Sequence, residues 1–134
     1  MKKDLVIIGG GAAGLAAALS ASHPDIDILV IEREKMLGGI LNQCIHNGFG
    51  LQVFKEELTG PEYASRYMDA FFKLNIEFLL DTTVVDVKKT DNFEVTVSSF
   101  EKGLFKIDAK AVILSSGCYE RTRGSIAIPG ERPK

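Results

Sequence analysis

Apolar runs separated by glycine and charged residues open the chain. Residues 5–8 form a short apolar run with β-branched members and glycines after it, which is typical of a buried parallel strand. An alanine-rich run up to Ser22 predicts a helix, and His23-Pro24 ends it because proline cannot continue a helix. Residues 26–31, apolar except for Asp27, predict a second strand. The order strand, helix, strand indicates a parallel α/β unit.

The middle of the chain predicts a loop and a second helix. Residues 36–54 contain four glycines and show little periodicity, so we expect an active-site loop there. The sequence Thr59-Gly60-Pro61-Glu62 predicts a helix start, with proline at the first helical position and an acid in the first turn. An apolar stripe at helical spacing should then pack on the sheet. Its members are Tyr63, Tyr67, Ala70, Phe71 and Leu74.

The second half of the chain predicts further strands. They span residues 76–80, 83–87, 93–97, 104–107 and 111–114. The first run, apolar except for Glu77, and the last, continuously apolar run predict buried strands, whereas residues 93–97 alternate between apolar and polar side chains. Turn residues at 91–92 and 102–103 separate the middle strands. The expected fold is a Rossmann-like α/β domain, a parallel sheet with an inserted three-stranded antiparallel β-meander.

A G-x-G-x-x-G pattern at Gly9, Gly11 and Gly14 lies between the first strand and the first helix. The first glycine permits a tight turn, the second lets a pyrophosphate approach the backbone, and the third lets the helix pack close to the strand. The helix start at Ala12 and Ala13 offers free N–H groups and the positive end of the helix dipole to phosphate. Because the flanking elements are complete, the pattern predicts dinucleotide binding rather than a purely structural turn.

An acidic residue, Glu32, follows the second strand. It lies close to the ~20-residue spacing from the turn at which a carboxylate accepts hydrogen bonds from a ribose 2′-hydroxyl group. This carboxylate would repel a 2′-phosphate, which argues against NADP at the site, although the neighbouring Arg33 weakens that argument. A pair of glycines, Gly38-Gly39, comes shortly afterwards.

The glycine turn, Glu32 and Gly38-Gly39 together resemble the FAD site of the pyridine nucleotide-disulphide oxidoreductase superfamily, whose flavoproteins have two dinucleotide-binding domains. The resemblance implies that the glycine pair runs close to the pyrophosphate and ribityl chain of FAD, and that the backbone at Val84 contacts adenine. The superfamily has Ala-Thr-Gly at the edge of the cofactor cleft. This chain has Ser115-Ser116-Gly117 there, a mild departure because Ser116 keeps a hydroxyl group.

The resemblance implies an oxidoreductase that passes hydride or electrons through FAD between NAD(P)H and a second, small-molecule substrate. Residues 38–50 and 117–123 also resemble flavin subunits of amine- and opine-oxidising enzymes and flavoproteins associated with glycerol-3-phosphate oxidation. Neither a second G-x-G-x-x-G nor the family's returning Gly-Asp pair occurs here. We therefore interpret residues 1–117 as a partial FAD-binding domain and residues 118–134 as a linker toward an absent NAD(P)-binding domain.

Two alternatives stay open. The missing Gly-Asp pair is also consistent with a truncated, non-catalytic fragment that folds without stable cofactor binding. An NAD-binding dehydrogenase domain would share the glycine turn and Glu32, but it would leave the glycine pair and the meander unexplained. A partial domain should also be inactive alone, and its uncovered sheet edge and apolar surface predict self-association.

The cysteines and the loop histidine identify no catalytic residue. Disulphide reductases of the superfamily have a C-x-x-x-x-C pair after the glycine pair, whereas Cys44 stands alone, so a disulphide reductase mechanism is disfavoured. Cys44 is either near the flavin or a half-buried thiol, and Cys118 is either near the cofactor or buried. His46 is either an acid or base beside the flavin or a loop histidine with a local hydrogen bond.

Composition and charge exclude other classes. The 134 residues suffice for one domain with a core, and the net charge of −2 indicates neither a nucleic acid nor an anionic membrane as partner. No segment is apolar over the ~20 residues that a membrane span needs. Asp4 and the glycine cluster fit a secretory signal poorly. We therefore expect a cytoplasmic protein, and the sequence suggests no metal site.

Overall fold

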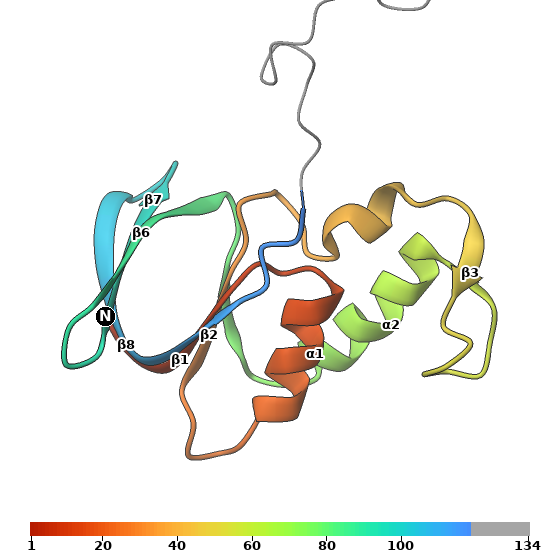
Figure 1. Cartoon of the computed structure of the whole chain (residues 1–134), viewed down its shortest axis with the longest axis horizontal. Coiled ribbons are helices and arrows are strands. Elements are labelled where there is room, and N and C mark those ends of the chain that lie inside the picture. Colours follow the sequence, from red (N-terminus) through yellow and green to blue (C-terminus); the bar gives the residue numbers. More distant parts are fainter. Residues whose placement is uncertain (119–134) are drawn as a thin grey trace, which may run out of the picture.

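The computed structural model describes residues 1–118 and has a six-stranded sheet at its centre (Figure 1). The strand order is β5-β2-β1-β8-β7-β6. The elements are β1 (Lys2–Ile8), α1 (Ala12–Ala21), β2 (Ile28–Ile31), the 3-10 helix η1 (Gly39–Gln43), β3 (Asn47–Phe49), β4 (Leu58–Thr59), α2 (Gly60–Phe72), β5 (Glu77–Leu79), β6 (Thr82–Lys89), β7 (Phe93–Ser99) and β8 (Gly103–Leu114). Strands β5, β2, β1 and β8 are parallel, and β6, β7 and β8 form the predicted antiparallel meander.

Side chains of β1 alternate between two hydrophobic cores, one on each face of the sheet. Leu5 and Ile7 pack with Leu15 of α1 and Phe71 of α2. Val6 points to the other face and packs with side chains of the meander, namely Val95, Val97, Ile107 and Ala109. In Figure 1 the meander accordingly lies to the left of β1 and β2, and both helices lie to the right. The continuously apolar first strand is thus buried on both faces, as its sequence predicted.

The last meander strand and the returning parallel strand are one continuous strand. β8 pairs antiparallel with β7 through its first half and parallel with β1 through its second half. Two separate strands at 104–107 and 111–114 were predicted, and that division is wrong. The polar residues between them, Asp108 and Lys110, occupy exposed positions of an extended chain, and Lys110 pairs with Asp4 instead of forming a turn.

β5 is an exposed edge strand, so the burial predicted for residues 76–80 is wrong. The strand pairs with β2 and lies at the end of the sheet order. Glu77 is exposed, and Phe78 reaches the rings of Phe71 and Phe72 at the end of α2. An apolar run alone does not tell a central strand from an edge strand, because the position in the sheet depends on the rest of the fold.

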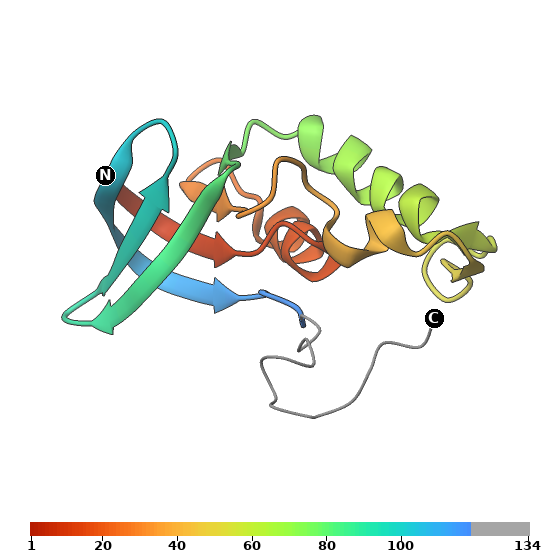
Figure 2. The same cartoon turned by 90° about the horizontal axis from the view of Figure 1, so that it is seen from above.

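Residues 36–54 are more regular than the predicted loop. They contain η1 and β3, and β3 pairs antiparallel with β4 in a separate two-stranded sheet. Figure 2 shows this segment beside the end of α2 that begins the helix, on the side away from the meander. Short elements of this kind lack enough residues for a periodic pattern, so they could not be predicted from periodicity.

α2 begins within the predicted start, but at Gly60, so that Pro61 takes the second helical position and not the predicted first one. The hydroxyl oxygen of Thr59 accepts a hydrogen bond from the Glu62 N–H, and the Glu62 carboxylate accepts one from the Thr59 N–H, which forms a capping box. Of the predicted stripe, Phe71 is buried in the core and Tyr67 packs at its margin, whereas Tyr63 turns toward β3. Within residues 1–118, neither α-helix is long and apolar enough to cross a membrane.

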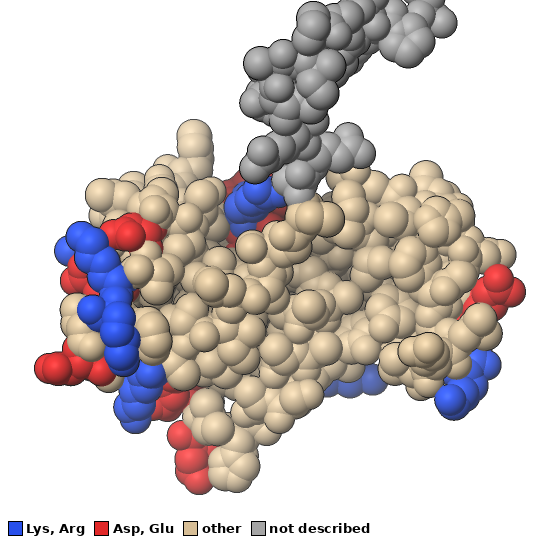
Figure 3. Space-filling model, viewed as in Figure 1, with Lys and Arg blue, Asp and Glu red and all other residues tan. Residues whose placement is uncertain are grey.

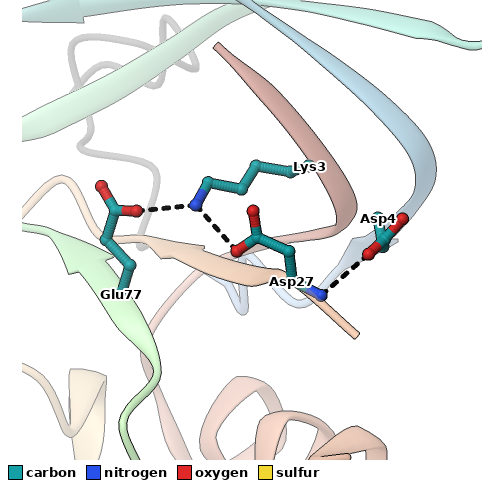
Figure 4. Close-up of polar contacts among 4 residues, drawn as sticks. All are labelled: Lys3, Asp4, Asp27 and Glu77. Atoms are coloured by element: carbon teal, nitrogen blue, oxygen red, sulfur yellow. Dashed lines mark hydrogen bonds and ion pairs between the residues drawn. The ribbon is translucent and has the colours of Figure 1, made fainter. Parts of the chain in front are cut away.

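An ion network joins the amino ends of the parallel strands (Figure 4). The Lys3 ammonium group lies 2.8 Å from an Asp27 carboxylate oxygen and 2.7 Å from a Glu77 carboxylate oxygen. The Asp4 carboxylate accepts a hydrogen bond from the Asp27 N–H at 2.9 Å. The lysine side chain is only 8% exposed. These contacts fix how β1, the start of β2 and β5 lie relative to one another.

Candidate cofactor site

A long cleft lies at the carboxyl ends of β1, β2 and β8, where open α/β sheets usually bind ligands. Its volume is about 1910 Å³. That exceeds the roughly 300–1,000 Å³ typical of small-molecule pockets and suits an extended ligand. Every predicted cofactor residue except Gly14 lines the cleft: Gly9, Gly11, Ala12, Ala13, Glu32, Arg33, Gly38, Gly39, Val84, Ser116 and Gly117.

Two glycines of the turn are required by the protein's own packing. Gly9 has a φ of +107°, and a Cβ there would lie 2.3 Å from the carbonyl oxygen of Ser115. A Cβ on Gly14 would lie 1.9 Å from the carbonyl oxygen of Gly9. The first position therefore provides the turn, and the third lets α1 pack against the end of β1. Gly14 serves the site through packing and not by facing the cleft.

Gly11 differs because the protein leaves space where its side chain would be. A Cβ there would meet only the Cα of Gly39, at 3.9 Å, within the described residues. Its φ of −75° is accessible to any residue. Nothing in the fold therefore requires glycine at this cleft position. A ligand that approaches the backbone at the start of α1 does require it, so the site passes this test for a dinucleotide.

Glu32 is a buried carboxylate at the end of β2, only 6% exposed. One of its oxygens accepts a hydrogen bond from the Gly10 N–H at 2.7 Å, and the other accepts one from the Glu34 N–H at 2.9 Å. Each carboxylate oxygen has two lone pairs, so both retain acceptor capacity. The carboxylate that the sequence predicted for ribose binding thus lines the cleft in a fixed orientation.

Gly10 and Leu37 are part of this arrangement, and their roles were not predicted. A Cβ on Gly10 would lie 2.4 Å from the Leu37 Cδ2 atom and 3.2 Å from a Glu32 carboxylate oxygen. Leu37 is buried. The sequence carries no signal for this contact, because Gly10 occupies a variable position of the glycine pattern and Leu37 lies in the predicted loop.

The glycine pair lies directly against the glycine turn. The Gly38 N–H donates to the Gly10 carbonyl oxygen at 2.8 Å, and Gly11 and Gly38 form a parallel bridge. A Cβ on Gly39 would lie 3.1 Å from the Cα of Gly11. Both glycines of the pair have positive φ angles, +105° and +59°. The two glycine-rich segments, separated in sequence, thus form one backbone surface beside the cleft.

Two adjacent serines follow β8. The Ser115 hydroxyl lies 3.0 Å from the carbonyl oxygens of Ile8 and of Gly9, which ties β8 to the glycine turn. Ser116 is exposed and lines the cleft together with Gly117. The departure from Ala-Thr-Gly therefore adds a hydroxyl group that bonds to the protein backbone at the first position and keeps one on an exposed residue of the cleft lining at the second.

The far end of the cleft is aromatic. Phe49 and Tyr63 line it, and the rings of Phe54 and Tyr67, which are not part of the lining, contact the ring of Tyr63. The Tyr63 and Tyr67 hydroxyl groups lie 3.5 Å apart, and this hydrogen bond raises the pKa of Tyr63 to about 12. Both the ring cluster and the neutral phenol make this end suited to an apolar or planar group rather than to a charged one.

The structure separates the two cysteines and the loop histidine. The thiol of Cys44 donates to the Ile40 carbonyl oxygen, and Cys44 is half-buried outside the cleft lining. His46 is exposed, and its Nδ1 atom lies 3.0 Å from the Asn47 carbonyl oxygen, which agrees with the loop histidine interpretation. Cys118 is exposed and lines the cleft, so its predicted alternative as a buried residue is wrong.

Charge is unevenly distributed over the surface. In the view of Figure 3, charged side chains gather at the left margin over the meander, and the middle of the face is mostly uncharged. Among residues 1–118, no group of three or more histidine, cysteine, aspartate or glutamate side chains is arranged to hold a metal ion. Residues 119–134, which make up all of the predicted linker except Cys118, lie outside the described residues.

A parallel sheet that presents a glycine turn and a buried carboxylate to a cleft at its carboxyl edge defines a dinucleotide-binding domain of the Rossmann type. The chain belongs to the pyridine nucleotide-disulphide oxidoreductase family, whose model matches residues 3–134. The family predicted from the sequence is thereby confirmed.

Curated relatives are longer than this chain. The thioredoxin reductase of Peptoclostridium litorale is 34% identical over 129 residues, which cover 96% of this chain and 38% of the relative. Hydrogen cyanide synthase subunit HcnB of Pseudomonas protegens is 27% identical, over 97% of this chain and 27% of the relative. The chain therefore spans less than two fifths of the length of either relative.

Solved structures agree with the fold. The L-proline dehydrogenase from P. horikoshii has a TM-score of 0.75 and 30% identity, over 91% of this chain and 24% of that chain. The thioredoxin reductase of T. acidophilum has a TM-score of 0.75 and 24% identity, over 92% of this chain and 38% of that chain. The predicted fold class, a Rossmann-like FAD-binding domain, is confirmed.

Proposed function

We propose that this chain is the FAD-binding part of an oxidoreductase in which FAD passes hydride or electrons between NAD(P)H and a second, small-molecule substrate. One observation carries the proposal: at Gly11 the protein leaves space for a side chain that the sequence does not supply. This space lies between α1 and the glycine pair, where the backbone can be approached by a pyrophosphate. A purely structural turn would not need it.

The residues of the cleft then have distinct binding roles. Glu32 accepts hydrogen bonds from the adenosine ribose, and the N–H groups at Ala12 and Ala13 face the phosphates. Gly38 and Gly39 let the chain pass close to the pyrophosphate and ribityl chain. The remaining predicted contacts come from Arg33, Val84, Ser116 and Gly117. FAD supplies the redox chemistry when it is bound, and these residues bind and orient it.

The NAD(P) site and the second substrate site would belong to other parts of a longer protein. The lengths of the relatives support this division, since the chain spans 38% of the thioredoxin reductase of Peptoclostridium litorale. Residues 1–117 would be the partial FAD-binding domain, and residues 118–134 would be the linker. On this proposal the chain alone has no turnover with NADH, self-associates, and comes from a cytoplasmic enzyme.

The names of relatives support two classes of second substrate. An L-proline dehydrogenase favours amine oxidation, whereas the thioredoxin reductases favour disulphide reduction. Cys44 lies outside the cleft lining and Cys118 lies in it, and both thiols are free. A disulphide reductase would therefore need a dithiol from another part of the protein.

The test is a titration of the purified protein with FAD, followed by flavin fluorescence and absorbance. We expect saturable binding that Glu32→Ala weakens about tenfold or more, since hydrogen bonds to a charged group are lost. Gly11→Ala should abolish binding, because its Cβ occupies the space left for the ligand. Glu94→Ala is the matched control, since it removes a carboxylate paired with Lys106 on the meander, outside the cleft.

Three results would contradict the proposal. A folded protein that binds neither FAD nor NAD would be the non-catalytic alternative. Tighter binding of NAD than of FAD would identify an NAD-binding dehydrogenase domain. Unchanged FAD affinity in Gly11→Ala would show that the open position does not face the ligand. Circular dichroism and urea unfolding of each variant establish whether a loss of binding reflects a loss of fold.

A further inference from the structure

We propose that Gly10 is a positioning residue: it holds the Glu32 carboxylate in the orientation from which it recognises the vicinal diol of a ribose. This inference rests on the proposed function of the cleft. It assigns a role to a residue that occupies a variable position of the glycine pattern. Gly10 acts through two features, its N–H group and its lack of a side chain, and both are directed at Glu32.

The first feature is the hydrogen bond. The Gly10 N–H donates to one oxygen of Glu32 at 2.7 Å, and the Glu34 N–H donates to the other at 2.9 Å. The backbone of Glu32 is itself fixed, because its N–H donates to Leu79 and its carbonyl oxygen accepts from Thr82. Glu32 can therefore move only by rotation about its side-chain bonds, and the N–H groups of Gly10 and Glu34 restrict that rotation. A carboxylate fixed in this way is pre-organised for a ligand.

The second feature is space. A Cβ at Gly10 would lie 3.2 Å from both the Cβ and a carboxylate oxygen of Glu32, and 2.4 Å from the Cδ2 atom of Leu37. Gly10 has no positive φ angle, so the turn itself does not require glycine there. Leu37 is 3% exposed and belongs to the core that contains Leu5 and Phe71. A side chain at position 10 would therefore lie between Leu37, which the core holds in place, and Glu32, and it would displace the Glu32 carboxylate.

The contact with Leu37 also provides a way to separate positioning from folding. Gly10→Ala alone combines the severe contact with Leu37 and the milder contact with Glu32, so it can fail to fold. In the double variant Gly10→Ala/Leu37→Ala the Cδ2 atom is gone, and the remaining close contacts are those with Glu32. Leu37→Ala alone is the matched control for the lost apolar volume.

The experiment compares two probes on each folded variant: FAD and an FAD analogue that lacks the 2′-hydroxyl group of the adenosine ribose. The wild type should prefer FAD by about tenfold, the effect of a hydrogen bond to a charged group. Leu37→Ala should keep that preference. Gly10→Ala/Leu37→Ala should reduce it to about threefold or less, because a displaced carboxylate no longer meets the hydroxyl group. Ser116→Ala should weaken both probes equally and leave the preference unchanged.

The preference for FAD over the analogue distinguishes a positioning role of Gly10 from a merely structural role. If Gly10→Ala/Leu37→Ala weakens FAD and the analogue by the same factor, Gly10 only supports the fold and the inference is wrong. A wild type that binds FAD and the analogue equally well would also overturn it, because Glu32 would then not recognise the diol. A wild type that binds no FAD would overturn the proposed function as well, and this result is distinct from the other two.

Discussion

The hydroxyl group of Ser115 lies 3.0 Å from the carbonyl oxygen of Gly9, so the ends of β8 and β1 are tied together at the glycine turn. Its backbone N–H also donates to the Ile8 carbonyl oxygen at 2.8 Å. The next residue, Ser116, is exposed to the cleft. Both residues line the cleft, but the Ser115 hydroxyl group is bonded to backbone carbonyl oxygens, whereas Ser116 is the more exposed residue.

This difference predicts opposite phenotypes for two conservative substitutions. Ser115→Ala should lower the free energy of unfolding by about 1 kcal/mol, because carbonyl oxygens at the turn lose a donor. Ser116→Ala should change the free energy of unfolding by less than about 0.5 kcal/mol, as is usual for an exposed site. It should instead weaken FAD binding. Urea unfolding and FAD titration of both variants measure the two effects, and equal phenotypes would contradict the assignment.

The glycine turn predicts a second contrast. Gly14→Ala should destabilise the protein by about 3 kcal/mol or more, because its Cβ would lie within 1.9 Å of the Gly9 carbonyl oxygen and the backbone must shift. Gly11→Ala should leave the free energy of unfolding within about 0.5 kcal/mol of the wild type, since its Cβ enters open space. Urea midpoints at matched concentration provide the measurement. A strongly destabilised Gly11→Ala would mean that the space is not available.

The glycine turn and Glu32 could be predicted because the residues that define them lie close together in the sequence. The strand, the three glycines and Glu32 lie within 32 residues, and each has a local physical reason for its residue type. The contact of Gly10 with Leu37 was not predictable, because the two residues are brought together only by tertiary packing. The same limit explains the errors at β5 and β8. Whether a strand is central or continuous depends on its partners, which lie far away in the sequence.

The capping box at the start of α2 predicts sensitivity to acid. Hydrogen bonds from the Thr59 N–H and hydroxyl group hold the pKa of Glu62 below its usual value of 4.5. A carboxylate with a lowered pKa stabilises the fold above its unfolded-state pKa, and this stabilisation is lost as the pH falls through the folded-state pKa. Thr59→Ala should lower the free energy of unfolding by about 1 kcal/mol at neutral pH.

The pH dependence of Glu62→Ala checks the sign of this effect. Wild type and variant should differ in urea midpoint above pH 4.5, and the difference should shrink as the pH falls below that value. The Thr59 hydroxyl group would still accept the Glu62 N–H, so a smaller loss is expected than in the double variant Thr59→Ala/Glu62→Ala. A difference that grows in acid would contradict the capping assignment.

The network around Lys3 predicts the opposite pH dependence at the amino ends of the strands. Burial by itself lowers the pKa of Lys3, but hydrogen bonds and the charges of Asp27 and Glu77 outweigh it, so the pKa lies above the usual 10.5. A raised pKa stabilises the fold below the unfolded-state value, and this stabilisation is lost as the pH rises through the folded-state pKa. The network should therefore contribute its full stabilisation to the free energy of unfolding at neutral pH and lose it only in strong alkali.

Lys3→Met tests this network because it keeps the apolar stem and removes the charge. We expect a loss of about 1–2 kcal/mol in the free energy of unfolding at neutral pH, below the ~3–5 kcal/mol of a fully buried pair, since the partners stay in contact with water. The Asp27 and Glu77 side chains are 56% and 46% exposed. The loss should shrink above pH 10.5. Lys110→Met is the matched control, because that side chain is 74% exposed and its pairing with Asp4 is solvated, so its substitution should have the smaller effect.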